Sequence, residues 1–140
     1  MLFTLCLFMT ACSPQDKSKT MDAVSDNGIN RVEVIDFFGT RRCVTCEAIE
    51  ANAKYTVEHF FAAEVANGTL TFKTVLVDEE SNYDIAERFE ATGTALFLNV
   101  IKEGKETHID LTDFGFSKGK DKALFSAELK TKIETELKKL

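Results

Sequence analysis

Two cysteines separated by two residues, Cys43 and Cys46, are the residues of this chain best suited to carry chemistry. On a helix this spacing puts the two sulfurs about one turn apart, close enough to close a disulfide ring. The thiolate is the reactive species in thiol–disulfide exchange, so reactivity depends on what lowers the pKa of the attacking thiol. The motif therefore predicts exchange between a dithiol and a disulfide.

The segments on either side of the motif read as a strand and a helix. Residues 31–39 become continuously apolar and are rich in β-branched and aromatic residues, which predicts a buried strand. From Ile49 to Phe61 apolar residues recur at spacings of three and four, which predicts a long amphipathic helix that stops near Gly68. Because Cys43 opens this helix, unpaired N–H groups and the macrodipole should favour its thiolate.

The rest of the chain continues the alternation of strands and helices. The predicted elements are strands at 69–78, 95–102 and about 106–111, a short helix from 81 that Gly93 ends, and a terminal helix from about 120. Glu103-Gly104 reads as the turn of an antiparallel hairpin. The order β-α-β-α-β-β-α, with parallel crossovers first and a hairpin last, predicts an α/β fold in which helices flank a central mixed sheet.

Length and charge limit the possible functions. A chain of 140 residues with 44% hydrophobic residues and twelve phenylalanines supports one substantial core, so we expect one folded domain. Its net charge of −6 argues against a protein that follows nucleic-acid phosphates. No nucleic-acid partner is therefore expected.

The first 30 residues read as a targeting segment and a tether. Residues 1–12 are apolar, too few to cross a bilayer as a helix, and end in small residues before Cys12, as in a secretory signal. Met9 to Ser13 resembles a bacterial lipobox, which implies lipidation of Cys12; a buried N-terminal helix or strand is the alternative. Residues 13–30 are polar and suit a flexible tether. We expect an extracytoplasmic protein, either membrane-anchored or periplasmic.

Motif and element order together resemble the thioredoxin fold over nearly all of residues 31–140. The resemblance implies that Cys43 is the nucleophile that forms a mixed disulfide and that Cys46 is the resolving thiol. It also implies that Asp36 is a buried carboxylate that relays a proton to the resolving cysteine; the alternative is a strand-end carboxylate facing water. Base action near neutrality requires that burial raise the pKa of Asp36.

The residues expected to meet a substrate come from two loops. Thioredoxins carry a cis-proline facing the disulfide, but the domain has no proline, and Ala95, after Thr94, occupies the matching place. A trans peptide there would change how a substrate strand pairs beside the sulfurs. Arg41 and Arg42 precede the motif, where they would favour the thiolate or attract an acidic partner; a solvated loop is the alternative.

A narrower resemblance rests on residues 37–43, Cys46 and Ile49-Glu50. These are similar to a thioredoxin-like family associated with bacterial arsenic operons, the ArsF-type nitrophenyl-compound nitroreductase subunits. Nothing in the sequence resembles a flavin or nicotinamide site, so the resemblance implies an electron-passing component without a bound cofactor. The implied partners are a protein thiol or disulfide substrate and a transmembrane thiol carrier that delivers electrons.

Two alternatives from other classes remain open. The domain could be an adaptor whose cysteines form one inert disulfide, which a potential below about −300 mV would reveal. The cysteines could instead bind a soft metal or arsenite, although within the chain a zinc site would need two more ligands from His59, His108 or carboxylates. We expect no metal site.

Phe114 and Phe116 flank Gly115. We expect these two side chains either to pack under the terminal helix or to form an exposed patch that binds a partner.

Overall fold

The computed structural model describes residues 28–140. The predicted signal segment, the lipidation candidate Cys12 and the tether up to residue 27 lie outside the described residues. Asn30, assigned to the tether, is bound to the domain, because its side chain donates to the Leu140 carbonyl at 3.2 Å and accepts from the Glu103 amide at 2.9 Å. Within residues 28–140 no helix is long and apolar enough to span a membrane.

Four strands form one mixed sheet in the order β2-β1-β3-β4. The strands are β1 (Arg31–Phe38), β2 (Leu70–Leu76), β3 (Ala95–Lys102) and β4 (Lys105–Asp110). β1 pairs in parallel with β2, whereas the β1–β3 and β3–β4 pairs are antiparallel. The α/β fold with a mixed sheet is confirmed. The expected series of parallel crossovers is wrong, since β3 reverses direction and only the β1–β2 crossover is parallel.

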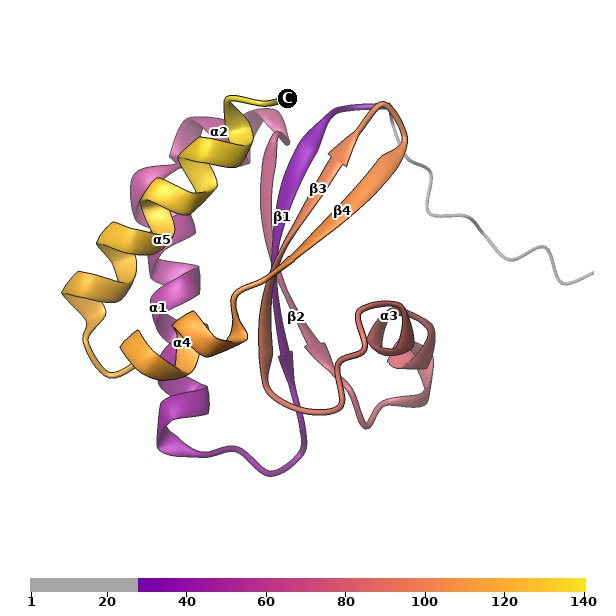
Figure 1. Cartoon of the computed structure of the whole chain (residues 1–140), viewed down its shortest axis with the longest axis vertical. Coiled ribbons are helices and arrows are strands. Elements are labelled where there is room, and N and C mark those ends of the chain that lie inside the picture. The colour runs from indigo at the N-terminus through magenta and orange to yellow at the C-terminus, as the bar shows by residue number, and fades with distance from the viewer. Residues whose placement is uncertain (1–27) are drawn as a thin grey trace, which may run out of the picture.

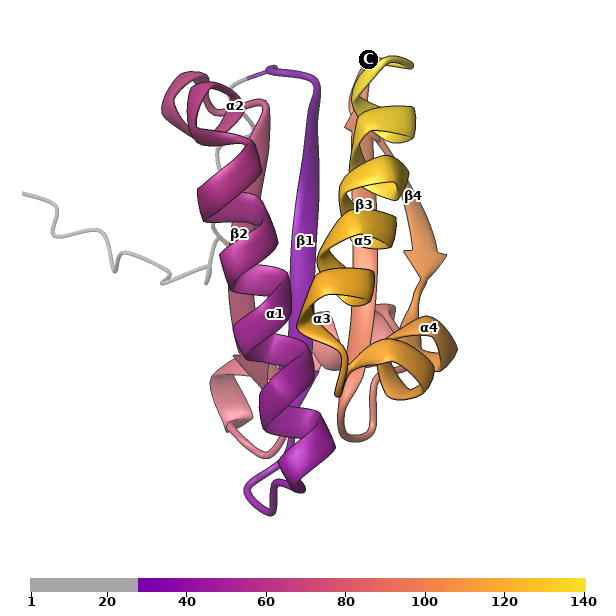
Figure 2. The same ribbon diagram turned by 90° about the vertical axis from the view of Figure 1, so that its left-hand side faces the viewer.

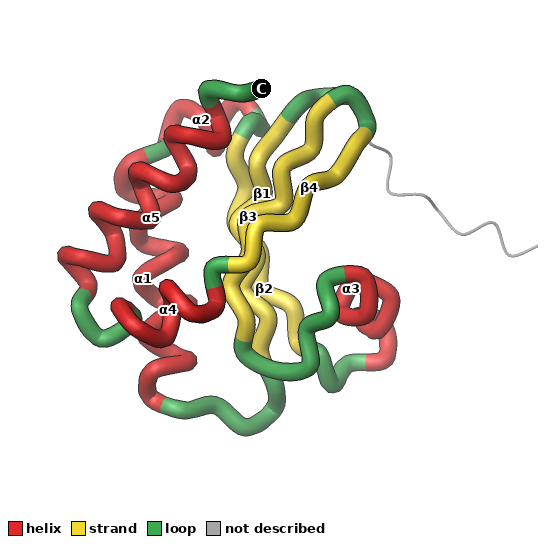
Figure 3. The backbone as a smooth tube through the Cα atoms, viewed as in Figure 1, coloured by secondary structure: helices red, strands yellow, loops and turns green. Residues whose placement is uncertain are grey.

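Helices cover the two faces of the sheet unequally (Figure 1, Figure 3). One face carries α1 (Val44–Phe60), α4 (Thr112–Lys118) and α5 (Lys122–Leu137), and Figure 2 shows α1 and α5 lying side by side on it. The other face carries the short η1 (Glu80–Asn82) and α3 (Tyr83–Arg88), and α2 (Ala62–Asn67) follows α1.

The strand alternation divides the core in two. Val32 and Val34 pack with the apolar residues of α1 and α5, including Ile49, Phe125 and Leu129. The intervening residues of β1, Ile35 and Phe37, pack on the α3 side of the sheet, together with Val75, Val77, Ala86, Phe89, Ala91 and Phe97. On the side of α1 and α5, the next residue in the alternation is a charged one, Asp36, and it is fully buried.

Two helix boundaries differ from those predicted. The long helix breaks at Phe61, which caps both α1 and α2 with a non-helical φ of −129°, although Gly68 ends α2 in the left-handed conformation as expected. α3 ends at Arg88 rather than at Gly93, and Glu90 takes the positive φ of 54° in the turn that follows. A residue other than glycine, Glu90, thus makes the sharp turn. The prediction that Gly93 ends the helix missed this turn because positive φ is uncommon for residues other than glycine.

Helix α4 occupies residues for which the sequence predicts no element. Its Phe114 does pack under the terminal helix, 5.0 Å from Phe125 between ring centroids, whereas Phe116 is 44% exposed. Gly115 and Gly119 face Ile49 of α1: an added Cβ would lie 3.3 Å from Ile49 at Gly115 and 2.9 Å at Gly119. The missing side chains allow α4 to lie directly against the first turns of α1.

Replacing Gly119 by alanine should therefore destabilise the domain by about 1–3 kcal/mol. The new Cβ would lie 2.7 Å from the Gly115 carbonyl oxygen, a backbone atom that can only move with the helix. Urea denaturation of oxidised protein measures the loss. Gly93→Ala is the matched control, because no atom lies within 4 Å of its added Cβ; equal effects of the two substitutions would show that α4 is not closely packed.

Candidate active site at the start of helix α1

The motif lies where β1 ends and α1 begins. Cys43 is the N-cap residue of α1, with extended backbone (φ −94°, ψ 160°), and its Sγ accepts a hydrogen bond from the Cys46 amide at 3.0 Å. Cys43 and Cys46 are joined by a disulfide, with Cα atoms 5.0 Å apart. When the bond is reduced, the same first-turn N–H groups and the helix dipole lie beside the sulfur of Cys43 and stabilise its thiolate.

The two sulfurs differ in access. Cys43 is exposed, whereas Cys46 is buried, with 7% of its surface accessible. Val44 between them is 78% exposed. An incoming disulfide can therefore reach Cys43 but not Cys46, which is the division between attacking and resolving thiols that the motif predicts.

The loop before the motif is tied to the end of β2. The carboxylate of Asp78 accepts hydrogen bonds from the Thr40 amide at 2.6 Å and from the Thr40 hydroxyl at 2.7 Å. These bonds hold the pKa of Asp78 below its usual range. They fix the loop 39–42 and with it the direction in which the chain enters α1. No sequence pattern predicts this contact, because Thr40 and Asp78 are 38 positions apart in the chain.

Asp36 lies on β1, on the face that α1 covers, and none of its surface is exposed. Its Oδ1 has no hydrogen-bond partner among the described residues. Burial, reinforced by the charge of Glu50 and opposed by that of Arg42, raises its pKa from 3.8 to about 7. The alternative of a carboxylate facing water is thus wrong, and Asp36 can exchange a proton near neutral pH.

Arg41 and Arg42 take opposite directions. Arg41 is exposed beside Cys43, so it is available to a partner. Arg42 turns inward: its Nη2 lies 3.5 Å from Oδ2 of Asp36 and 3.4 Å from the carbonyl oxygen of Cys46, and its Nη1 binds Glu50. The alternative of a solvated loop is therefore wrong for Arg42, whose side chain contacts Glu50, Asp36 and the backbone of Cys46.

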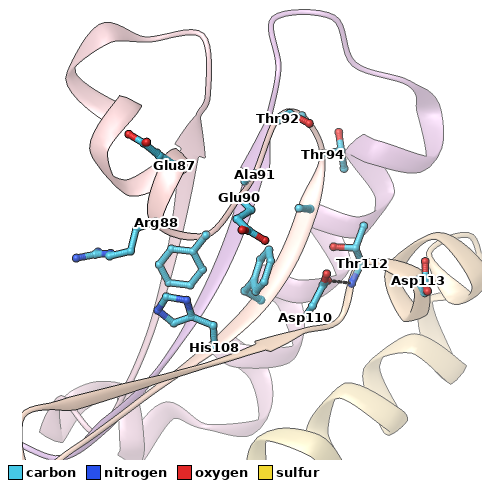
Figure 4. Close-up of a pocket in the computed structure, with 14 residues that line it drawn as sticks. Glu87, Arg88, Glu90, Ala91, Thr92, Thr94, His108, Asp110, Thr112 and Asp113 are labelled. Carbon is cyan, nitrogen blue, oxygen red and sulfur yellow. Dashed lines mark hydrogen bonds between the residues drawn. The ribbon is translucent and has the colours of Figure 1, made fainter.

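Thr94 and Ala95 reach the motif end of the sheet because β3 is antiparallel to β1. Ala95 opens β3 opposite Phe37 near the end of β1, and no peptide bond within residues 28–140 is cis. Both residues line a cavity of about 630 Å³ that extends from Glu87 near the end of α3 to Asp113 in α4 (Figure 4). Thr94 and Ala95, two of the residues predicted to contact substrate, thus line this cavity, whereas Cys43 and Cys46 do not.

In the part of the chain that the structure describes, the two histidines do not form a metal site with the cysteines. His59 stacks on Tyr55 with ring centroids 4.9 Å apart, and His108 stacks on Phe89 at 3.7 Å. Among the described residues no group of three or more histidines, cysteines and carboxylates is arranged to hold a metal ion. Both histidines instead pack against aromatic rings.

The mixed four-stranded sheet, the helices on its two faces and the motif at the start of α1 agree with the fold that the sequence resembles. The fold is thioredoxin-like. Fasciola hepatica thioredoxin is a similar solved structure, with 22% identity and a TM-score of 0.41 over 66% of this chain and 80% of that one. A structure described as that of a malarial protein shares 18% identity at a TM-score of 0.41, over 59% of this chain and 83% of that one.

No family model matches the chain, and no curated protein matches it. The narrower resemblance to the ArsF-type family accordingly stays a prediction. Function has to be inferred from the residues around the disulfide.

The contribution of Asp36 to the stability of the oxidised protein should fall as the pH rises toward 7, and Asp36→Asn should remove this contribution. The native pKa of about 7 exceeds the ordinary 3.8, so the native state binds this proton more tightly than the unfolded chain. The stabilisation is fully present below pH 3.8 and lost as the pH passes 7. The difference in unfolding free energy between wild type and variant should change by up to about 4 kcal/mol.

Urea denaturation of both oxidised proteins from pH 4 to pH 8 measures this difference. Taking the difference cancels the contributions of carboxylates that the substitution leaves in place. A difference that does not vary with pH would mean that Asp36 ionises in the native protein as it does in the unfolded chain.

Proposed function

We propose that this protein is an extracytoplasmic thiol–disulfide oxidoreductase that works through Cys43 and Cys46. The observation that carries the proposal is the exposed sulfur of Cys43 at the start of α1, where the Cys46 amide donates to it. An inert structural disulfide has no need of an accessible sulfur stabilised as an anion. The thioredoxin-like fold and the disulfide support a redox role.

The chemistry begins with the dithiol form. The Cys43 thiolate attacks one sulfur of a substrate disulfide, which forms a mixed disulfide and releases the other substrate sulfur as a thiolate that takes up a proton. Cys46 then gives its proton to the Asp36 carboxylate and attacks the Cys43 sulfur. The mixed disulfide breaks, the second substrate sulfur leaves and the Cys43–Cys46 bond forms, so two electrons pass to the substrate. The same steps in reverse oxidise a dithiol.

Thr94, Ala95 and exposed Arg41 are the proposed contacts to the substrate. Arg41 precedes the motif in the loop after β1, and Thr94 and Ala95 lie where β3 begins, paired with the end of β1 that leads into that loop. Turnover as a reductant requires a thiol donor, which for an extracytoplasmic protein is a transmembrane thiol carrier. In the role implied by the ArsF-type resemblance, the domain passes electrons on and does not itself bind a flavin.

Trapping with a Cys46→Ser variant tests the assignment. The reduced full-length variant, mixed with oxidised glutathione or insulin, should retain a mixed disulfide on Cys43, because the resolving thiol is gone. Cys43→Ser is the matched control and should trap at least about tenfold less, since Cys46 is buried. Mass spectrometry of peptides separates adducts on Cys43 from those on Cys6 and Cys12. Equal trapping by both variants contradicts the proposal.

The redox potential separates this function from the adaptor alternative. Wild-type protein equilibrated with glutathione or dithiothreitol buffers should show a potential above about −300 mV by counting free thiols. A lower potential would identify an inert disulfide and with it the adaptor.

The proposed anchor is tested at Cys12. In a bacterial host the full chain should incorporate labelled fatty acid and sediment with membranes, and Cys12→Ser should abolish both, because the acylated sulfur is removed. Cys6→Ser is the control and should behave as wild type. An unlabelled wild-type protein in the soluble fraction would remove the anchor from the proposal.

A further inference from the structure

Three charged side chains lie in a row behind the disulfide: Asp36 on β1, Arg42 in the loop and Glu50 on α1. Exposure increases along the row, since the side chain of Asp36 has 0% of its surface accessible, Arg42 21% and Glu50 29%. One guanidinium therefore faces two carboxylates, one fully buried and one at the surface. How the guanidinium of Arg42 divides its contacts between Asp36 and Glu50 therefore decides how strongly the buried carboxylate of Asp36 is stabilised by positive charge.

The contacts of Arg42 favour Glu50. Nη1 forms a close ion pair with Oε2 of Glu50, whereas Nη2 is 3.5 Å from Asp36, at the outer limit of a hydrogen bond. The same Nη2 also lies 3.4 Å from the Cys46 carbonyl oxygen. The ring of Phe38 lies 4.6 Å beneath the guanidinium carbon and fixes the plane of the group. Arg42 is thus held between Glu50 and the backbone of the second cysteine.

Apart from Arg42, no positively charged group among the described residues acts on Asp36. Its neighbours in the sheet are Thr74 on β2 and Leu96 on β3, neither of which carries a charge. Lys73 is bound on the opposite face by Glu33, at 3.3 Å. α1 contributes Cys46 and Glu50, and of the described groups only Arg42 and Glu50 act on Asp36 through charge. A buried carboxylate normally requires a complete ion pair; this one has a shared and distant partner.

We propose that Glu50 is a positioning residue that draws the Arg42 guanidinium away from Asp36, which leaves the buried carboxyl free to exchange a proton with the dithiol. This inference rests on the proposed function, in which Asp36 is the general base, and it names the residues that control the protonation of Asp36. Without Glu50, the guanidinium is free to turn fully to Asp36 and hold it as a carboxylate, a weaker base for the thiol of Cys46. Without Arg42, the two carboxylates repel each other and Asp36 keeps its proton to higher pH.

Infrared titration of the oxidised protein tests the arrangement. The carbonyl stretch of a protonated buried carboxyl, assigned to Asp36 by its loss in Asp36→Asn, gives the midpoint directly. Glu50→Gln should lower this midpoint by at least about one pH unit, which is a tenfold change in the ratio of protonated to ionised carboxyl. Glu47→Gln is the matched control: it removes the same charge from an exposed position one turn earlier on α1 and should leave the midpoint unchanged.

A double-mutant cycle shows whether Glu50 acts through Arg42. Arg42→Gln should raise the midpoint, and in that background Glu50→Gln should lower it by clearly less than in the wild type. Equal shifts in both backgrounds would mean that Glu50 acts by its charge alone and would overturn the positioning role. So would an unchanged or raised midpoint in Glu50→Gln itself.

Kinetics provide the functional readout. The pH profile for release of the mixed disulfide should move to lower pH in Glu50→Gln, in step with the infrared midpoint. A profile that stays in place while the infrared midpoint moves would overturn the link to the dithiol. Because the infrared titration uses the disulfide form and needs no turnover, a protein inactive in exchange would refute the proposed function alone.

Discussion

The hydrogen bond from the first turn of α1 to the sulfur of Cys43 is the interaction on which the site depends. Backbone N–H groups at a helix start have no partner within the helix, and here one of them is satisfied by a sulfur atom. The strand, the loop and the helix all serve to keep that sulfur at the helix end and in contact with solvent. The first step of the proposed exchange begins from the Cys43 thiolate, which this arrangement stabilises.

The second constraint is the sheet topology. Because β3 runs against β1, its first residues return to the edge where β1 delivers the chain to the motif. Phe37 and Ala95, which are 58 positions apart in the chain, are therefore brought together by one antiparallel pairing. A parallel β3 would have placed Thr94 and Ala95 at the far end of the sheet.

Local patterns carried most of what the sequence could predict. Apolar spacing located β1, α1 and α5, the run from Ala95 to Lys102 matched β3, and the motif placed Cys43 at a helix start. α4 was missed because Gly115 disfavours a helix in isolation, and only the close contact with α1 explains Gly115 and the cap residue Gly119. The inward turn of Arg42 and the bonds between Thr40 and Asp78 were missed for a related reason: they join residues that only the folded chain brings close.

The attachment of Asn30 has a consequence for how the domain would meet its partners. Asn30 binds the C-terminal carbonyl and the β3–β4 turn, at the end of the sheet opposite the motif (Figure 1). Eight residues of β1 then separate this point from the loop before Cys43, a span of roughly 25 Å. The chain therefore enters the domain at the end opposite Cys43, so a partner can bind the reactive end of the sheet without meeting the point of entry.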